Sequence, residues 1–337
     1  MADCLITRLK ASVSDASLLK IGEFRFSFKS SGDSTPFKMQ LTSHTGIAKL
    51  KTASGNNALG YNSASINASE LTIPTTITEF YITNSDIELV IDNKYDLKEV
   101  TIYDPSSANN VYMDLDELYF SDIRTFGFCG AKNGRVNVSR MNSKVITLDL
   151  IGSELSFNLE LLRDNPNLRY LSIYNSGVSG DVAVLGTLPS YSTGTTFSSY
   201  NNYIYGDLVA AMKTQTSCKA LSVSTNKEAP NQPLTGDLAK LPASIKTMNA
   251  TGRKTEFTWS NRAESSFAIS IQNANLGNYV DTMLINQANC ILNQPHSQWD
   301  NVINVTGSHD ETNASVASAI GTIKAAGWSV TINGKTY

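Results

Sequence analysis

The sequence is poor in charge. Asp, Glu, Lys and Arg make up 17% of its 337 residues, whereas they form roughly a quarter of an average globular chain. Ser, Thr and Asn are abundant instead. The formal net charge is −3 and no run of Lys or Arg occurs, which argues against a nucleic-acid partner. Nothing approaches the ~18 consecutive apolar residues of a membrane span, so we expect no membrane insertion.

Paired cysteines and a leader segment are also missing. Cys4, Cys129, Cys218 and Cys290 are far apart and lack the close pairs that metal and redox motifs need. We therefore expect reduced, structural cysteines. Residues 1–8 contain no apolar segment, so the sequence predicts no signal peptide there and synthesis in a cytosol.

The usual signatures of catalysis are absent. The three histidines, His44, His296 and His309, stand at no metal-ligand spacing from one another or from a Cys/Asp cluster. No nucleophile elbow, phosphate loop or dinucleotide fingerprint occurs. We interpret residues 309–311, His-Asp-Glu, as a solvated loop.

Two acidic groups offer enzymatic or metal-binding alternatives. Glu154 and Glu160 invite a paired-carboxylate glycosidase interpretation, but they flank an ordinary repeat. Asp104, Asp114 and Asp116 could coordinate Ca²⁺, but the loop lacks a full acidic set. We expect no enzyme activity, no cofactor and no bound metal.

A short motif, apolar-x-x-apolar-x-apolar, recurs along most of the chain. It occupies residues 77–82, 97–102, 123–128, 145–150, 168–173, 218–223 and 245–250, with degraded copies ending at Phe197, Ile271 and Val305. The alternation within each copy is typical of a strand that buries two residues and exposes the one between. Most steps between copies fall within the 20–29 residues of leucine-rich repeats. Stacking such units gives one parallel sheet and a continuous core.

The second half of each unit also recurs. Residues 155–171 predict a short helical turn, a stop at Asn165-Pro166 and then the next strand. A Gly-Asp pair followed by apolar residues occurs at Gly180-Asp181, Gly206-Asp207 and Gly236-Asp237. Glycine permits the turn and aspartate can cap the segment after it.

These motifs resemble the leucine-rich-repeat proteins, particularly the irregular, Ser/Thr/Asn-rich ones of gut Bacteroides-type bacteria and their bacteriophages. The resemblance covers residues 77–310. It departs from the family pattern because the Asn after the strand is mostly absent, although Asn84, Asn175 and Asn273 are near that place. It implies an α/β repeat fold, a leucine-rich-repeat-like solenoid with one long parallel sheet.

The two ends lack the repeat. In residues 1–76, alternation at 24–28 and 37–41 around a turn at 30–34 predicts a β-rich N-terminal cap or docking module. In residues 311–337, Val316, Ala319, Ile320 and Ile323 share one helical face and Gly327 is a good stop. A strand over 328–332 follows, which gives a helix-strand C-terminal cap.

The solvent-facing side of the sheet is the expected interaction surface. Its central row is predicted as Tyr81, Thr101, Gly127, Asp149, Ser172, Thr196, Ser222, Asn249, Ser270 and Asn304. Tyrosine with Ser and Asn is a mixture that binding surfaces favour; alternatively, these residues merely tolerate exposure. The candidate binding residues are Tyr81, Tyr103 and Tyr174 on this face and Tyr200, Tyr203 and Tyr205 in an insertion over 191–205.

The family resemblance also implies a function. It suggests a non-enzymatic bacteriophage virion structural protein in a tail, fibre or head-decoration position. Such a protein would contact other virion proteins, further copies of itself, or a host surface glycan or protein during receptor binding. The alternatives are an exported Bacteroides-type adhesin at the cell surface and, disfavoured above, a glycan-active enzyme.

Overall fold

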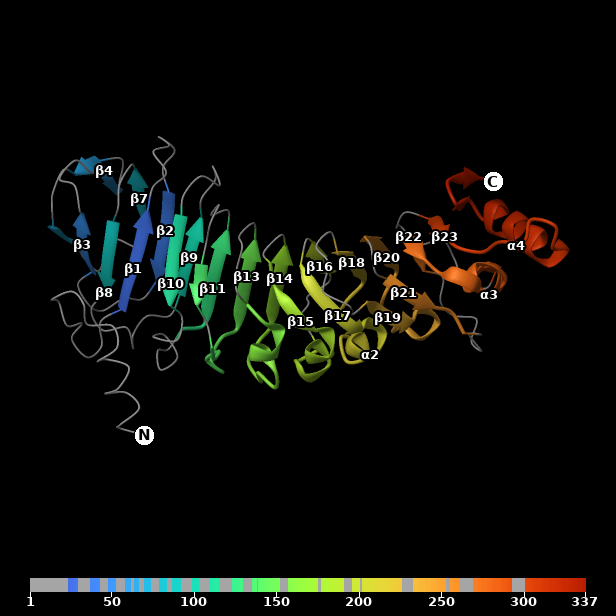
Figure 1. The fold of residues 1–337 in the computed structure, drawn as a ribbon, viewed down its shortest axis with the longest axis horizontal. Coiled ribbons are helices and arrows are strands. Elements are labelled where there is room, and N and C mark those ends of the chain that lie inside the picture. Colours follow the sequence, from blue (N-terminus) through green and yellow to red (C-terminus); the bar gives the residue numbers. More distant parts are fainter. Residues whose placement is uncertain are drawn as a thin grey trace.

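The computed structural model describes the first 138 residues mainly as strand backbones. The described ranges are 24–29, 37–42, 48–52, 58–61, 64–66, 70–73, 79–83, 87–91, 99–103, 110–114, 123–129, 135–137, and 139–337 except 152–156, 175–176, 191–195, 201, 226–232, 253–254, 261–268 and 293–300. The molecule is elongated, with the N-terminal strands at one end and helices α3 and α4 at the other (Figure 1).

A long, open, mostly parallel sheet runs through the molecule (Figure 1). Its 15 strands follow the order β25-β24-β23-β22-β20-β18-β16-β14-β13-β11-β9-β2-β7-β4-β5. From β9 to β24 each neighbouring pair is parallel. These strands are β9 (Glu99–Tyr103), β11 (Thr125–Cys129), β13 (Thr147–Ile151), β14 (Tyr170–Tyr174), β16 (Thr196–Tyr200), β18 (Ala220–Thr225), β20 (Thr247–Gly252), β22 (Ser270–Asn275), β23 (Val302–Thr306) and β24 (Ser329–Ile332). The motif copies over this range therefore predicted strands that do pair in parallel.

The inward residues of these strands form shared columns. Leu148 lies opposite Leu171, and Phe197 lies opposite Leu221; all four are buried. The β14–β16 pairing of Ile173 with Ser199 places Leu171 and Phe197 in the same column. The predicted stacking of Leu148, Leu171 and Leu221 is thus confirmed.

Two of the degraded copies were read two residues out of register. Phe197 was assigned to the last apolar place of its copy, yet it pairs with Leu221 in the middle place. Ile271 likewise pairs with Met248 in the middle place. In each case the motif has lost one of its apolar residues, so the sequence pattern alone does not fix the register.

Strands from the N-terminal region are interleaved with the first repeats. β2 (Phe37–Thr42) lies antiparallel between β7 (Glu79–Thr83) and β9. A second sheet, of six strands, has the order β12-β10-β1-β8-β3-β6. The remaining strands of this region are β1 (Phe24–Lys29), β3 (Ala48–Thr52), β4 (Ala58–Tyr61), β5 (Ala64–Ile66), β6 (Glu70–Ile73), β8 (Ile87–Ile91), β10 (Asn110–Asp114) and β12 (Arg135–Asn137). Strand pairing therefore crosses the expected boundary at residue 76 in both sheets.

A smaller parallel sheet and short helices lie along one side of the long sheet (Figure 1). The sheet has the order β15-β17-β19-β21. Its strands are β15 (Ser179–Asp181), β17 (Tyr203–Asp207), β19 (Leu234–Asp237) and β21 (Thr255–Thr258), and the helical segments are the 3₁₀ turns η3 (Leu159–Leu162), η4 (Val182–Thr187) and η5 (Leu238–Lys240) and the helix α2 (Leu208–Met212). The predicted helical turn in 155–171 is η3.

The Gly-Asp pairs end three of these strands, as predicted. Asp181, Asp207 and Asp237 each cap the helical segment that follows and accept a hydrogen bond from a backbone N–H two or three residues later, at 2.8, 2.9 and 3.2 Å. Asn158 caps η3 in the same way. In these four repeats a side-chain oxygen caps the helical segment and satisfies an otherwise unpaired N–H group.

Buried amides join neighbouring repeats. Asn202, fully buried after β16, donates to Ile173 O at 3.2 Å and accepts from Val178 N at 3.0 Å. Gln215, also fully buried, donates to Leu185 O at 2.8 Å. Asn202 thus satisfies backbone groups of the preceding repeat. Near the family's asparagine position the sequence offered Asn84, Asn175 and Asn273, not Asn202. Asn273 is instead exposed, and the other two lie outside the described residues.

The C-terminal end matches its prediction closely. α4 (Ala314–Ala325) is capped by Asn313 and buries Val316, Ala319, Ile320 and Ile323. Gly327, at φ 84°, follows it. β24 then turns into the short strand β25 (Lys335–Thr336). The 3₁₀ turn η6 (Gly277–Tyr279) and the helix α3 (Val280–Leu292), which packs against α4, were not predicted.

The cysteines described with side chains, Cys218 and Cys290, are buried and form no disulfide. None of the helices in the described ranges has the length and apolar character needed to cross a membrane.

Candidate functional site

The solvent-facing side of the long sheet is the candidate interaction surface. On β14 the burial alternates: Leu171 and Ile173 are buried, whereas Tyr170, Ser172 and Tyr174 point away from the core. The strand pairings carry this alternation across the sheet, since directly opposite residues share a face.

The central outward row follows from the register. It consists of Thr101, Gly127, Asp149, Ser172, Ser198, Ser222, Asn249, Gln272, Asn304 and Thr331. Ser198 and Gln272 replace the predicted Thr196 and Ser270, because the sequence register was two residues out at β16 and β22. The row remains one of small hydroxyl and amide side chains.

The predicted tyrosines of the long sheet fall into one neighbouring row. Tyr81 and Tyr103 both lie opposite Lys38 of β2, so these two residues, predicted in different rows, share one. Further along the same row, Tyr174 lies opposite Tyr200. Tyr174 is exposed to 44%, while the side chains of Tyr81, Tyr103 and Tyr200 lie outside the described residues.

Tyr203 and Tyr205 lie elsewhere. They belong to β17 of the four-stranded sheet, opposite Ser179 and Asp181, and both are half-buried. The prediction that Tyr200, Tyr203 and Tyr205 cluster on one loop was therefore wrong. Residues 196–200 of this segment form β16 and residues 203–205 belong to β17, and the weak motif there made the segment look like an insertion.

An exposed tyrosine was missed. Tyr170 opens β14, is exposed to 47% and lies on the same face as Tyr174. The motif begins with Leu168 and assigns no outward place between Leu168 and Leu171. Extending the period-two alternation one residue back from Leu171 would have found it.

Asp149 is the one charged residue of the central row. It lies between Gly127 and Ser172. Burial raises the pKa of its carboxyl group, and a hydrogen bond with the Ser172 side chain partly offsets that rise. Its Oδ1 atom is buried and has no hydrogen-bond partner among the described residues. An acceptor covered in this way costs free energy until a donor reaches it.

A chain of three amides crosses the same face near the C-terminal end. The Asn304 amide donates to Asn273 Oδ1 at 3.4 Å, and the Asn273 amide donates to Asn249 Oδ1 at 3.1 Å. Asn273, at φ 57°, is the extra residue of a bulge in β22. The bulge brings its side chain onto the outward face, and sequence alternation alone cannot predict this placement.

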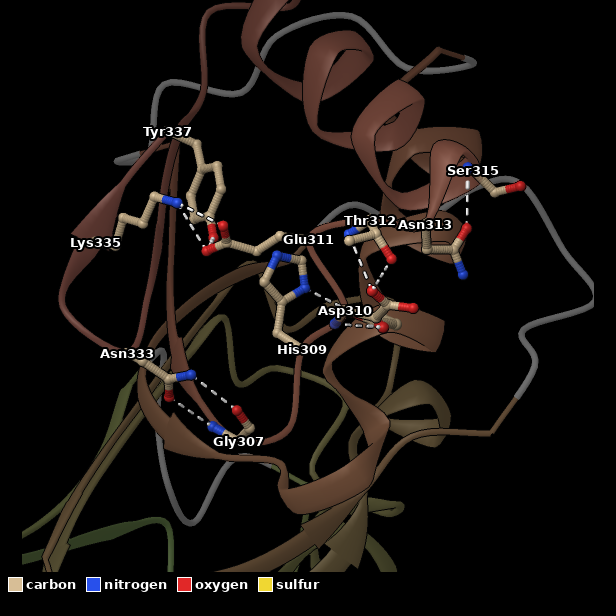
Figure 2. Close-up of polar contacts among 11 residues, drawn as sticks. Gly307, His309, Asp310, Glu311, Thr312, Asn313, Ser315, Asn333, Lys335 and Tyr337 are labelled. Atoms are coloured by element: carbon tan, nitrogen blue, oxygen red, sulfur yellow. Dashed lines mark hydrogen bonds and ion pairs between the residues drawn. The ribbon is translucent and has the colours of Figure 1, made fainter.

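A second polar cluster lies at the C-terminal end, between α3, α4 and the β24–β25 turn (Figure 2). His309 Nδ1 lies 2.6 Å from Asp281 Oδ1 of α3, and the His309 side chain is only 4% exposed. The ring of Tyr337 meets the imidazole edge-on at 5.6 Å between centroids. The interpretation of residues 309–311 as a solvated loop was thus wrong for His309, because its side chain is buried and pairs with Asp281, which is distant in sequence.

The outer part of this cluster is charged and exposed. Lys335 Nζ lies 2.7 Å from both Glu311 oxygens, and the Tyr337 hydroxyl donates to Glu311 Oε1 at 2.6 Å (Figure 2). These contacts lower the pKa of Glu311 and raise those of Lys335 and Tyr337. The cluster fastens the end of the chain to the loop before α4.

The His309–Asp281 pair orients an imidazole. Nε2 of His309 is buried and has no hydrogen-bond partner among the described residues, so none of the described hydroxyl or thiol groups bonds to it. Within the described ranges, no three His, Cys, Asp or Glu side chains are grouped to hold a metal ion. The geometry supports a structural role.

Of the other acidic candidates, Glu160 and Asp114 lie in the described ranges. Glu160 is exposed on η3 and ion-paired with Arg163, and Glu154 lies outside the described residues. Asp114 is on β10, opposite Asn137, whereas Asp104 and Asp116 are not described.

Comparison with known proteins finds no matching family model, no similar curated protein and no similar solved structure.

Proposed function

We propose that the protein is a non-enzymatic, leucine-rich-repeat-like solenoid that binds a partner through the outward face of its long sheet. The observation that carries this proposal is the composition of that face. A row of nearly uncharged hydroxyl and amide groups crosses the parallel strands, and two exposed tyrosines flank it on β14. Tyrosine on a rigid strand loses little side-chain entropy on binding, and Ser and Asn supply adaptable hydrogen bonds.

The solenoid assignment draws on the repeating unit. Each central repeat contributes a strand of the long sheet, then a short strand of the four-stranded sheet and a capped helical segment. Asn202, which follows strand β16, bonds to backbone groups of the preceding repeat. An asparagine after the strand is also part of the leucine-rich-repeat pattern. Such a stack presents an extended surface built from neighbouring units.

For the biological setting, we propose a bacteriophage virion structural protein in a tail, fibre or head-decoration position. This part rests on the family resemblance of the sequence. Peptide mass analysis of purified virions tests it: the chain should be present at a stoichiometric level. Its presence instead on the surface of uninfected bacterial cells would favour the exported adhesin.

The binding face has a direct test. Fluorescently labelled protein should attach to host cells, and Tyr174→Ala should weaken attachment about tenfold. Tyr279→Ala is the matched control, because Tyr279 is exposed to 41% but lies on η6 outside the sheet. Equal attachment of both variants and the parent would contradict the assignment of this face.

A further inference from the structure

The outward side of β14 concentrates exposed aromatic surface. Among the residues described with side chains, the large exposed hydrophobic ones are Tyr170, Tyr174 and Tyr279. Tyr170 and Tyr174 lie on the same face of one strand, four residues apart, which is about 13 Å along the strand. The small Ser172 stands between them.

The strand next to it adds a carboxylate. Asp149 of β13 lies opposite Ser172, within the span between the two tyrosines. On the other side of Asp149, Gly127 contributes no side chain. Beyond it, Thr101 leans over the glycine: its Cγ2 atom lies 3.1 Å from the position that a Cβ atom on Gly127 would take. Tyr170, Ser172, Tyr174 and Asp149 together are called the tyrosine patch below.

We propose that the tyrosine patch binds a neutral sugar unit of a glycan, with a ring packed on Tyr170 or Tyr174 and its hydroxyl groups bonded to Asp149 and Ser172. This inference rests on the proposed function, because it names the ligand of the same sheet face. It specifies the ligand of that face as a neutral sugar and places it on β13 and β14.

The chemistry of the patch matches a sugar. One face of a pyranose ring carries C–H groups that pack on an aromatic ring, and its edge carries hydroxyl donors. Asp149 is half-buried on the outward side of β13, and its carboxylate is an acceptor for a sugar hydroxyl. A hydrogen bond to a charged acceptor contributes more than one between neutral groups.

The row beside the patch extends the match. Ser198, Ser222 and Asn249 continue the line across the next strands, at about 4.8 Å per strand. All three are uncharged and able to donate and accept. A glycan chain lying across the strands would meet a hydrogen-bonding group at every step.

A cationic ligand fits less well. A cation–π contact needs an aromatic face within about 6 Å of the ammonium, whereas the backbone positions of Tyr170 and Tyr174 are about 13 Å apart along the strand. The central row contains a single carboxylate, Asp149, and otherwise no charge. An ammonium would therefore find one carboxylate to pair with, whereas a sugar that packs on one of the rings can also bond through its hydroxyl groups to both Asp149 and Ser172.

The test uses the full chain on an array of neutral oligosaccharides built from glucose, galactose, mannose and N-acetylglucosamine. Sialylated and amine-bearing glycans on the same array provide charged comparisons. The strongest neutral sugar is then titrated calorimetrically. We expect Asp149→Asn and at least one of the variants Tyr170→Ala and Tyr174→Ala to weaken its binding about tenfold, while Tyr279→Ala leaves it unchanged. Melting temperatures of all variants verify that they are folded.

The outcomes separate this inference from the function on which it rests. Neutral binding lost in the patch variants supports both. Cell attachment that is weakened by Tyr174→Ala but not competed by any array sugar overturns the sugar assignment and leaves the binding face standing. Selective binding of amine-bearing glycans would make the ligand a cation. Attachment unaffected by every patch variant overturns both.

Discussion

The Oδ1 atom of Asp181 occupies the space that a Cβ atom on Gly206 would need. The same relationship recurs one repeat later, where a Cβ on Gly236 would lie 2.8 Å from Asp207 Oδ1. Each capping carboxylate therefore lies against the glycine of the next turn. Gly206 is required both by this close approach and by its φ of 103°, which side-chain-bearing residues rarely adopt.

Gly206→Ala should lower the free energy of unfolding by about 3 kcal/mol, because it adds backbone strain and a steric clash. Chemical denaturation measures the change. Gly321→Ala is the matched control: Gly321 lies in α4, where a Cβ would meet nothing within 4 Å, so alanine should stabilise by up to about 1 kcal/mol. In the Asp181→Ala background the loss from Gly206→Ala should shrink, since the clashing oxygen is gone. Additive effects would show that the two residues are not coupled.

Leu171→Asp should prevent soluble folding or cost several kcal/mol, because Leu171 is 2% exposed and an unpaired charge would enter the shared core. Tyr170→Asp provides the comparison, since the adjacent side chain lies on the opposite face of the same strand. Expression yield and thermal melting distinguish the two. A soluble Leu171→Asp variant with an unchanged melting temperature would refute the register.

Asp281→Ala should destabilise the C-terminal end by about 2–3 kcal/mol. Asp281 accepts from the His309 ring and, at 3.1 Å, from the Asp310 backbone N–H, and the imidazole would remain buried without this partner. Hydrogen exchange should increase in α3 and the loop before α4. Glu160→Ala, which removes an exposed ion pair with Arg163, should cause no measurable change. Equal behaviour of the two variants would mean that the buried pair contributes nothing.

Asp149→Asn should change how stability depends on pH. Burial raises the folded-state pKa of Asp149 above its ordinary value of 3.8. The folded state therefore binds the proton more tightly than the unfolded state does. The stability due to this group is present below pH 3.8 and lost as pH rises through the raised pKa. The stability of the asparagine variant relative to the parent should thus increase from pH 3 to pH 7.

Asp310→Asn gives the opposite sign and serves as the control. Hydrogen bonds from the Thr312 hydroxyl and backbone lower the pKa of Asp310. Its contribution to stability is present above its ordinary pKa and lost as pH falls through the lowered value. Urea denaturation of both variants between pH 3 and pH 7 measures the two trends, and parallel trends would contradict the assigned environments.

The sequence predicted the parts of the fold that depend on local patterns. The alternation around Leu148, Leu171 and Leu221 located their strands, and the apolar face of α4 identified its buried residues. It did not predict that β2 enters the long sheet, because its alternation fits any half-buried strand and does not name a partner. α3 was missed although Val280, Met283, Leu284 and Ala288 follow a helical period, since the buried Gln287 interrupts the apolar face.

The candidate site was predicted with similar limits. Tyr174 was found because it follows a strong motif copy. The placement of Tyr203 and Tyr205 was wrong because the motif copy at β16 is too weak to reveal that β16 and β17 are strands. The burial of His309 depends on Asp281, and no local pattern relates residues so far apart in sequence.

The position of β2 sets an order on biosynthesis. β2 is complete at residue 42, but its two neighbours β7 and β9 are complete only at residues 83 and 103. At synthesis rates of about 5–20 residues per second, both edges of this strand await their partners for several seconds while the chain grows. Lys38 is the second residue of β2 and lies opposite Tyr81 and Tyr103, and a lysine on an unpaired strand disfavours pairing with other chains. The residue that ends up between two tyrosines in the finished sheet can thus also protect the nascent chain from aggregation.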